Sequence, residues 1–305
     1  MSFEVIPFAE GEARLDWLRL TEALEAGHRL PRAEVGDTFL YRGRDTLLTR
    51  SAWIDGLGLA VKSATIFPGN AALGRPTING GVSLLSDDTG ELEALVDFHL
   101  VTKWKTAGDS LLAARRLARK GARRILVVGA GTVAESLIAA YGAAFPGARF
   151  TVWNRSAPGA ERLAARHGAR VAVDLESAVR EAEIVTSATM ATEPLIRGEW
   201  LQPGQHVDLI GAFRPDMREA DDEALRRARI FLDNRATVID HIGEMKDPLA
   251  RGVIAESDIV ADFYDLERGG FRRESDSEIT LFKNGGGAHL DLMTARHILD
   301  AWREG

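Results

Sequence analysis

One short segment limits the fold of this chain more than any other: an apolar run, a glycine loop and a helical pattern in direct succession. Residues 125–128 (ILVV) lead into 129–134 (GAGTVA), after which the sequence is helical in pattern. Glycines here allow a tight turn and a close approach of the backbone to a phosphate, and the following helix N-terminus offers amide groups. The segment predicts a dinucleotide-binding unit; the alternative is a tight strand–helix connection without a ligand.

The residues around this segment alternate between strand-like and helix-like patterns. Helices are expected from about 132 and from about 158. The expected strands are 124–128, 150–153, 171–173, 184–187, 206–210 and 230–232. Such alternation implies right-handed crossovers and a parallel sheet with helices on both faces. The segment therefore predicts a doubly wound, Rossmann-type α/β domain.

The first hundred residues follow a different pattern. After a helical start, short β-like runs occur at 38–42, 46–49, 57–67, 81–85 and 92–98. The turn-rich 86–90 (SDDTG) between two of them is a hairpin signal. These runs predict a mainly antiparallel sheet in an α+β domain, followed by a helix over about 102–119. We expect one domain at 1–115 with 285–305, to which the final helix from Gly287 returns, and the Rossmann domain at 116–284.

Composition excludes several classes of protein. The 38 Lys and Arg against 45 Asp and Glu give a net charge of −7, which argues against nucleic-acid binding. With no cysteine, disulfides and thiolate-bound zinc are excluded, and the scattered histidines show no metal-ligand spacing. His289, after three glycines, is either structural or close to a ligand. No apolar run is long enough for a membrane span and no signal peptide is evident, so we expect a cytoplasmic protein without membrane or nucleic-acid partners.

The end of the second Rossmann strand bears on the type of dinucleotide. NAD sites usually have an acidic residue there that binds the ribose hydroxyls. This chain has Asn154, Arg155 and Ser156 instead. A guanidinium and a hydroxyl favour a 2′-phosphate, which a carboxylate would repel. NADPH is therefore the preferred cofactor and NADH the second choice, unless Arg155 is simply a surface residue.

A lysine in the first domain stands out because it interrupts an apolar run. Lys62 ends the sequence 58–62 (GLAVK). A buried ammonium is unfavourable without a counter-charge, so Lys62 suggests an anionic ligand. The alternative is a lysine on an edge strand whose ammonium reaches solvent.

At this point several motifs together resemble the ornithine cyclodeaminase/mu-crystallin family, over nearly the whole chain. The matching blocks are 62–68, Thr77, 106–107, the 129–131 loop, 211–219 and 282–291. The resemblance implies a homodimer, with a substrate-binding and dimer-forming first domain and a Rossmann second domain.

The resemblance also implies roles for individual residues. Arg32, Lys62 and Lys105 would hold a substrate carboxylate, and Thr77 would lie beside the nicotinamide and the substrate. Lys62, Thr77 and Lys105 are thus the predicted catalytic residues. Lys105 stands where the family usually has arginine; it keeps the charge but loses the bidentate fork. The predicted cofactor residues are Gly129, Ala130, Gly131, Thr132, Val133, Asn154, Arg155, Ser156, Ala188, Thr189, Met190 and Asn284.

One departure from the family pattern separates its activities. Cyclodeaminases carry Asp where this chain has Phe213, and an apolar ring cannot accept a proton or bind an ammonium by charge. The comparison favours the ketimine reductases of the family: NAD(P)H-dependent reduction of a small cyclic α-imino acid such as Δ1-pyrroline-2-carboxylate. The alternatives are ornithine cyclodeamination or amino-acid dehydrogenation, and an NADP-loaded protein that binds small ligands without turnover.

Overall fold

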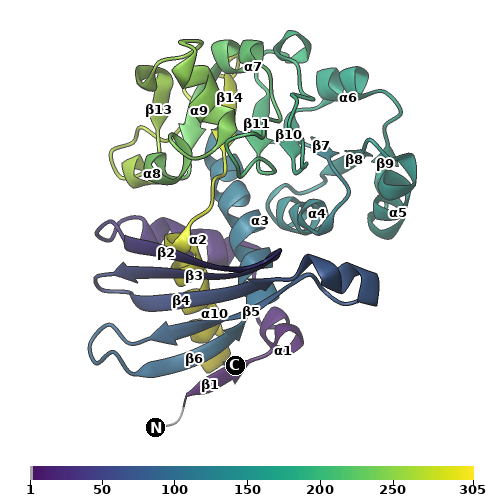
Figure 1. Cartoon of the computed structure of the whole chain (residues 1–305). Coiled ribbons are helices and arrows are strands. Elements are labelled where there is room, and N and C mark those ends of the chain that lie inside the picture. The colour runs from purple at the N-terminus through teal and green to yellow at the C-terminus, as the bar shows by residue number, and fades with distance from the viewer. Residues whose placement is uncertain (1–2) are drawn as a thin grey trace. The chain divides into compact units, whose positions relative to one another are not determined.

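The computed structural model describes residues 3–305, which form two compact units (Figure 1). Unit 1 contains the chain up to residue 105 together with 287–305, and unit 2 contains 106–286. The border falls inside one continuous helix, α3 (Phe98–Leu117), rather than at 115/116 as the sequence suggested. Because the helical pattern is unbroken there, nothing in the sequence marks the border.

Unit 1 is built on a six-stranded sheet in the order β1-β6-β5-β4-β3-β2. Its strands are β1 (Glu4–Ile6), β2 (Glu34–Arg42), β3 (Asp45–Ile54), β4 (Gly58–Ile66), β5 (Ile78–Leu85) and β6 (Leu92–Asp97). The strands β2 to β6 pair antiparallel in sequence, and only β1 with β6 is parallel. The predicted antiparallel sheet is confirmed, although β2 begins earlier than expected.

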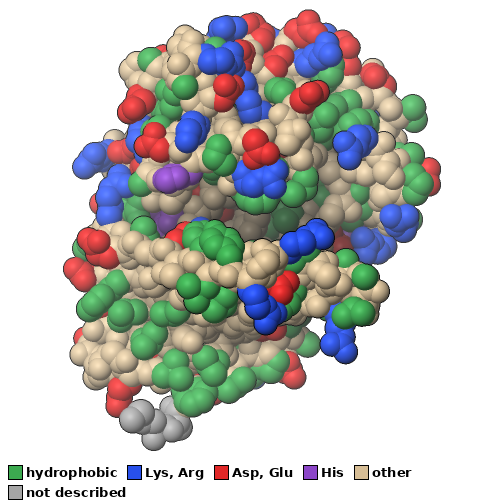
Figure 2. Space-filling model, viewed as in Figure 1, with side chains coloured by type: hydrophobic (Ala, Val, Ile, Leu, Met, Phe, Trp, Pro, Cys, Tyr) green, Lys and Arg blue, Asp and Glu red, His purple; other side chains and the backbone are tan. Residues whose placement is uncertain are grey.

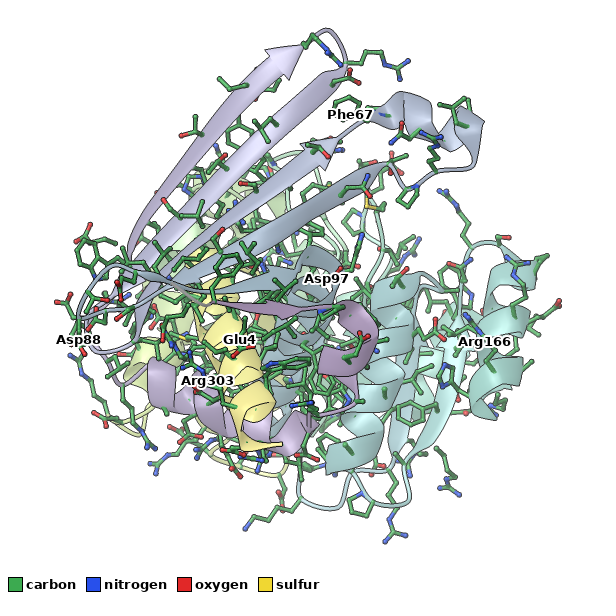
Figure 3. All side chains as sticks on the ribbon, turned by 90° about the horizontal axis from the view of Figure 1, so that it is seen from below. Glu4, Phe67, Asp88, Asp97, Arg166 and Arg303 are labelled. Carbon is green, nitrogen blue, oxygen red and sulfur yellow. The ribbon has the colours of Figure 1, made fainter. Side chains whose placement is uncertain are left out.

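Helices cover one face of this sheet. They are α1 (Phe8–Glu12), α2 (Trp17–Gly27), the start of α3 and α10 (Ala288–Glu304), with the short helix η1 (Pro68–Leu73) between β4 and β5. The Asp16 carboxylate caps α2, and the Asp97 carboxylate accepts from the Leu100 N–H at the start of α3. Figure 3 shows η1 on an arm beyond Phe67. Helix α10 packs on α2, β3 and β4, so the last helix does return to the first domain.

Unit 2 contains an eight-stranded, fully parallel sheet in the order β13-β12-β14-β11-β10-β7-β8-β9. The strands are β7 (Arg124–Val128), β8 (Arg149–Trp153), β9 (Arg170–Val171), β10 (Ile184–Ser187), β11 (His206–Leu209), β12 (Ala228–Leu232), β13 (Ile259–Ala261) and β14 (Ile279–Lys283). Six of these were expected. The sequence missed β13 and the central β14, because no long helix precedes β14 to mark it as part of an alternating pattern.

Helices on both faces complete the doubly wound arrangement. They are α4 (Thr132–Ala144), α5 (Ala157–His167), α6 (Leu175–Glu181), η2 (Gly198–Trp200), α7 (Asp222–Arg227), α8 (Arg235–Val238), α9 (Gly243–Ala250), η3 (Glu256–Asp258) and η4 (Phe263–Asp265). Two buried apolar clusters lie on opposite sides of the sheet: Leu126 and Val128 face one, and Val127 faces the other. The predicted Rossmann fold is confirmed.

Charged side chains of both signs are mixed over the visible surface (Figure 2). Within residues 3–305, no helix has the length and apolar character needed to cross a bilayer.

Candidate active site

The glycine loop of unit 2 has the geometry that its sequence predicts. Gly129 has a φ of +115°, and a Cβ there would lie 2.7 Å from the Ala188 carbonyl oxygen, so only glycine fits. Gly131 is the N-cap of α4 and supplies no side-chain cap. A Cβ on Gly131 would meet open space, and no side chain of the N-cap occupies the first-turn N–H groups, which a phosphate could bind. The loop fits a dinucleotide pyrophosphate.

A pocket of about 580 Å³ opens at this loop, at the carboxyl ends of the strands where such folds bind ligands. It brings together eight of the predicted cofactor residues. They are Gly129, Ala130, Gly131, Asn154, Arg155, Ala188, Thr189 and Met190. Residues that the sequence analysis did not name also line it: Trp153, Ala191, Thr192, Glu193 and Leu195.

Four predicted cofactor residues lie outside this lining. Thr132 and Val133 form the first turn of α4, and Ser156 is the N-cap of α5. The Asn284 amide is buried and donates to the Thr106 carbonyl and the Ser110 hydroxyl, both at 3.0 Å. Asn284 therefore ties β14 to α3 within unit 2, and its assignment to the cofactor stays a prediction.

Arg155 is placed as a phosphate-binding residue would be. It is exposed on the pocket rim, and within residues 3–305 it has no carboxylate partner. The Asn154 amide donates to the Ser156 carbonyl at 2.9 Å, which fixes the turn that carries Arg155. The residues present fit a 2′-phosphate better than a ribose hydroxyl.

A buried carboxylate that the sequence analysis missed supports the pocket from behind. Glu219 is fully buried, and its Oε1 accepts from the Ser187 hydroxyl (2.6 Å) and from the N–H and hydroxyl of Thr189 (both 2.8 Å). Its Oε2 accepts from the Gly211 N–H (2.6 Å). One side chain thus holds the loop after β10 and the loop after β11 in place. The block 211–219 showed a family motif but gave no sign of this role.

In unit 1, the sheet register sets three charged residues in a row. Arg50 pairs with Asp37 on one side and with Lys62 on the other, and cross-strand partners face the same side of a sheet. The Arg50 guanidinium forms a fork with Asp37, with Nε–Oδ1 at 3.0 Å and Nη2–Oδ2 at 2.7 Å. Because the hairpin turns at 55–57, the sequence alone would place position 50 opposite 62; this signal for Arg50 was available and was missed.

Two ammonium groups and one carboxylate meet beside this row. Lys62 Nζ lies 2.9 Å from Asp291 Oδ1 and donates to the Thr102 hydroxyl at 2.8 Å. Lys105 Nζ lies 3.0 Å from the same Oδ1. Within residues 3–305, Asp291 Oδ2 has no hydrogen-bond partner. Lys62, Lys105 and Asp291 are all buried, so the predicted lysines come together around an anion that the sequence analysis did not name as a site residue.

Burial and charge shift the titration of these groups in opposite directions. Burial lowers the pKa of Lys62 to about 8, although Asp291 acts against this shift. The two neighbouring ammonium groups lower the pKa of Asp291 to about 2 despite its burial. Near neutral pH, Asp291 is ionised and most Lys62 carries a proton that it can release.

The wall above these charges is apolar. A pocket of about 160 Å³ has Arg50, Lys62 and Asp291 at its charged end, and its other lining residues are Leu48, Ala64, Ile66, Ile78 and Phe98. The Lys62 ammonium also lies 4.5 Å from the centre of the Phe98 ring. Such a pocket suits a small molecule with an anionic group and a hydrocarbon body.

Three other residues of the sequence analysis lie apart from this lining. Arg32 is exposed, whereas Arg50 occupies the pocket. Thr77 is half-buried, and its carbonyl accepts from the Phe67 N–H at 2.8 Å; its neighbour Ile78 lines the pocket. His289 is buried edge-on against His28, and burial holds its pKa well below the usual value. The roles of Arg32 and Thr77 stay predictions, and the burial of His289 agrees with a structural role.

Phe213 lies on the loop after β11 and is 55% exposed. The neighbouring carboxylates of this loop are already engaged: Asp216 pairs with Arg214, and Glu219 binds loop N–H and hydroxyl groups. No acid on the loop 211–219 is available for the role of the cyclodeaminase aspartate.

Comparisons with known proteins identify the family of this chain. Residues 52–305 match the ornithine cyclodeaminase/mu-crystallin family. The Δ1-pyrroline-2-carboxylate reductase of Paracoccus denitrificans is 49% identical, over 97% of this chain and 96% of that protein.

Two solved structures share the fold over almost the full length. The Δ1-pyrroline-2-carboxylate reductase of Thermococcus litoralis, in complex with NADH and L-proline, has a TM-score of 0.88 at 25% identity, over 99% of this chain and 98% of that one. An archaeal alanine dehydrogenase dimer with bound NAD has a TM-score of 0.89 at 26% identity, over 100% and 97%. With its Rossmann loop, its lysine pair and a family match over most of its length, the chain belongs to the ornithine cyclodeaminase/mu-crystallin family.

Proposed function

We propose that this protein is an NAD(P)H-dependent reductase of small cyclic α-imino acids, with Δ1-pyrroline-2-carboxylate, reduced to L-proline, as its type substrate. The observation that carries the proposal is the buried lysine pair on Asp291 at the end of a small apolar pocket. The Paracoccus relative, named for this reaction, supports the same substrate.

The charges around the pocket fit one carboxylate. Arg50, Lys62 and Lys105 contribute three positive charges, while Asp37 and Asp291 contribute two negative ones. A single substrate carboxylate balances the remaining charge, since an unbalanced buried cation is unfavourable. The apolar wall then contacts the ring methylenes. A free amino group on the substrate side chain, as in ornithine, finds no anionic partner among Leu48, Ala64 and Ile66.

Lys62 is the proposed proton donor to the imine nitrogen. Its lowered pKa, about 8, makes the ammonium a better acid than an exposed lysine while leaving it mostly protonated at neutral pH. Asp291 stays ionised and holds the ammonium in place. A nicotinamide cofactor would supply the hydride, and the role of Lys62 and Lys105 is to hold and orient the substrate carboxylate.

The cofactor is NADPH in preference to NADH. Arg155, without a carboxylate partner in the described chain, would pair with the 2′-phosphate. The cytoplasmic location expected from the sequence stays a prediction.

Oxidation of NADPH in the presence of Δ1-pyrroline-2-carboxylate, followed by absorbance, tests the function. We expect rapid turnover with the imine, slower turnover with NADH, and no reduction of NAD with L-ornithine. Ammonia release from ornithine, with the imine inert, would instead establish the cyclodeaminase. Tight NADPH binding without turnover of any imino acid would favour the binding protein.

We further propose that the protein is a homodimer formed through the sheet of unit 1. The face of this sheet opposite the Arg50–Lys62 row carries large apolar side chains that are more than a third exposed: Val5, Leu40, Leu47, Trp53 and Leu95. Monomers rarely expose such a patch, and a second copy would cover it. The archaeal alanine dehydrogenase of the same fold is described as a dimer.

The mass in solution tests this interface. Light scattering after size-exclusion chromatography should give twice the chain mass, and Leu47→Asp should shift it toward the monomer. Leu73→Asp is the matched control and should leave the dimer intact, because Leu73 is an exposed leucine of the same unit that lies on η1 and not on this sheet face. A monomeric wild-type protein would refute the interface.

A further inference from the structure

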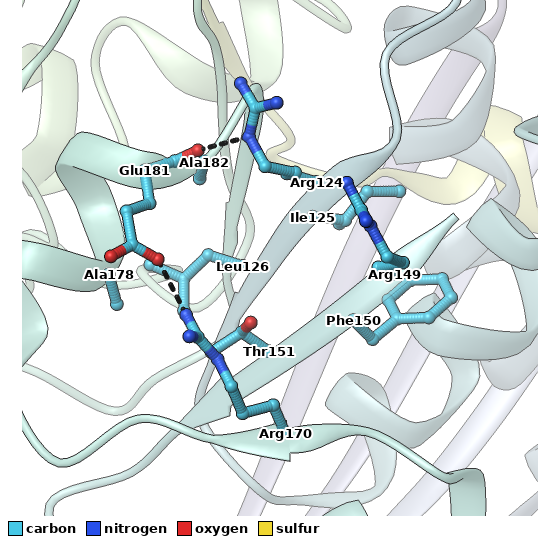
Figure 4. A pocket seen from close by; sticks show the side chains of 10 residues that line it. All are labelled: Arg124, Ile125, Leu126, Arg149, Phe150, Thr151, Arg170, Ala178, Glu181 and Ala182. Carbon is cyan, nitrogen blue, oxygen red and sulfur yellow. Dashed lines mark hydrogen bonds and ion pairs between the residues drawn. The ribbon is translucent and has the colours of Figure 1, made fainter. Parts of the chain in front are cut away.

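A second pocket of unit 2 lies at the opposite ends of the strands from the cofactor loop. It has a volume of about 290 Å³ and is drawn in Figure 4. Strands β7, β8 and β9 each begin with an arginine, namely Arg124, Arg149 and Arg170, and all three line this pocket. The cofactor residues follow the carboxyl ends of the same strands, so the two pockets are distinct places on one sheet.

The sheet register brings these arginines to one face. Arg124 and Arg149 are direct partners in the pairing of β7 with β8, and Arg170 pairs with Thr151, two residues along from Arg149. Residues two apart on a strand point to the same side, so the three guanidinium groups share that side. Like charges directly opposite each other in a sheet are destabilising unless an anion lies between them.

The protein supplies too little negative charge for these groups. Arg170 Nη2 pairs with Glu181 Oε2 at 2.7 Å, while Arg124 Nε donates to the backbone carbonyl of Glu181, also at 2.7 Å. The nearest carboxylate to Arg124 is Glu183 at 3.5 Å, which Arg119 approaches equally closely. Within residues 3–305, Arg149 has no ion pair.

The floor of the pocket is apolar. Leu126, Ala178 and Ala182 lie beneath the guanidinium groups and are buried (Figure 4). These side chains are at most 7% exposed, so a carbon skeleton joining two anionic groups would lie between the guanidinium groups rather than on the apolar floor. The size of the pocket, near the lower limit for organic ligands, restricts that skeleton to a few carbon atoms or one ring.

We propose that this pocket is a binding site for a small organic dianion, either a dicarboxylate or a phosphate monoester. Arg124, Arg149 and Arg170 carry three positive charges, and the Glu181 carboxylate neutralises one of them. A ligand with two negative charges would balance the other two. Arginine presents paired N–H donors that match both carboxylate and phosphate oxygens. The ligand bridges Arg149 to Arg124 or Arg170 and relieves the repulsion between neighbouring strands.

Arg149 offers a clean test, because its replacement breaks no ion pair. Calorimetric titration of the full-length protein with succinate and with phenyl phosphate, at constant ionic strength, should show binding by at least one of them and none by acetate. The ligand that binds tells a dicarboxylate site from a phosphate site. Arg149→Gln should weaken that binding by about tenfold or more, and without ligand it should raise the melting temperature, since one of two facing like charges is gone.

Arg226→Gln is the matched control, because Arg226 is an exposed arginine of unit 2 on α7, outside the pocket. It should change neither dianion binding nor the melting temperature, and all variants should retain the wild-type affinity for NADPH. Dianion binding no tighter than that of acetate, or equally tight binding by Arg149→Gln, would overturn the proposal.

Discussion

The two candidate sites of the molecule are built from different material. In unit 2 the pocket depends mainly on backbone: Gly129 with its positive φ, Gly131 at an uncapped helix start, and loops held by Glu219. In unit 1 it depends on charged side chains, where Lys62 and Lys105 share Asp291. Backbone N–H groups bind phosphate without any buried charge of their own, whereas buried ammonium groups need a fixed counter-ion.

This difference predicts different sensitivities. The substrate site should fail sharply when one charge is removed, because each remaining charge is then left without its partner inside the protein. The cofactor site should lose affinity by degrees, since several N–H groups and side chains share the ligand. Four variants compare the two sites, from the largest expected effect to the smallest.

Lys62→Met should have the largest effect. It removes a ligand of the substrate carboxylate together with the proposed proton donor, and loss of a positioned acid alone costs roughly 10²–10⁴-fold in rate. We expect kcat/KM for Δ1-pyrroline-2-carboxylate to fall by roughly 10³-fold, with NADPH affinity unchanged. Steady-state kinetics and NADPH fluorescence titration measure the two quantities.

Lys103→Met is the control for Lys62. Lys103 lies on the same helix as Lys105 but pairs with Glu12 at 2.5 Å and does not line the substrate pocket. Its replacement should change kcat/KM by no more than about twofold. If Lys62→Met lowered kcat/KM by less than about tenfold, Lys62 would not be the proton donor.

Asp291→Asn should have the second-largest effect and should change the pH profile. In the wild-type protein, kcat/KM should fall as the pH rises through about 8, because Lys62 then loses the proton that it needs for binding and donation. Burial lowers this pKa and Asp291 raises it, so the variant should lose activity at a lower pH than the wild type. We also expect roughly a 10²-fold loss at neutral pH and about 3 kcal/mol of destabilisation from the unpaired lysines.

Urea unfolding and a pH series of kcat/KM measure these effects. Asp291→Glu, which keeps the charge, should restore part of both. A pH profile that keeps the wild-type midpoint in Asp291→Asn would show that this carboxylate does not control Lys62.

The same contrast explains what the sequence could predict. The Rossmann segment was read correctly because its strand, loop and helix are contiguous, and each contributes a local pattern. The substrate site joins Arg50, Lys62, Lys105 and Asp291, which come from two strands and two helices far apart in the sequence. Lys62 was noticed because it interrupts an apolar run, whereas Lys105 and the carboxylate-binding role of both lysines came only from the family resemblance. Asp291 has no local pattern that separates it from an ordinary first-turn acid of a helix.

Arg155→Gln should act on one cofactor only. A charge-assisted hydrogen bond contributes about 1.5–3 kcal/mol, which corresponds to roughly a 10- to 100-fold higher KM for NADPH. The KM for NADH, which has no 2′-phosphate, should stay the same. Equal effects on both cofactors would mean that Arg155 supports the loop rather than a phosphate.

Glu219→Gln should have the smallest of these effects, and it should not distinguish the cofactors. In the variant, the remaining side-chain oxygen still accepts from the N–H and hydroxyl of Thr189. The new NH2 group replaces the oxygen that accepted from the Gly211 N–H, so this N–H loses its acceptor. A single mismatch of this kind costs about 1 kcal/mol or more, so we expect the KM values for NADPH and NADH to rise in parallel by about fivefold. Glu223→Gln, an exposed acid of α7 in the same unit, should leave both unchanged. A higher KM for NADPH alone would contradict the positioning role. A displaced loop should weaken contacts with the part of the cofactor that NADPH and NADH have in common, so both KM values should rise.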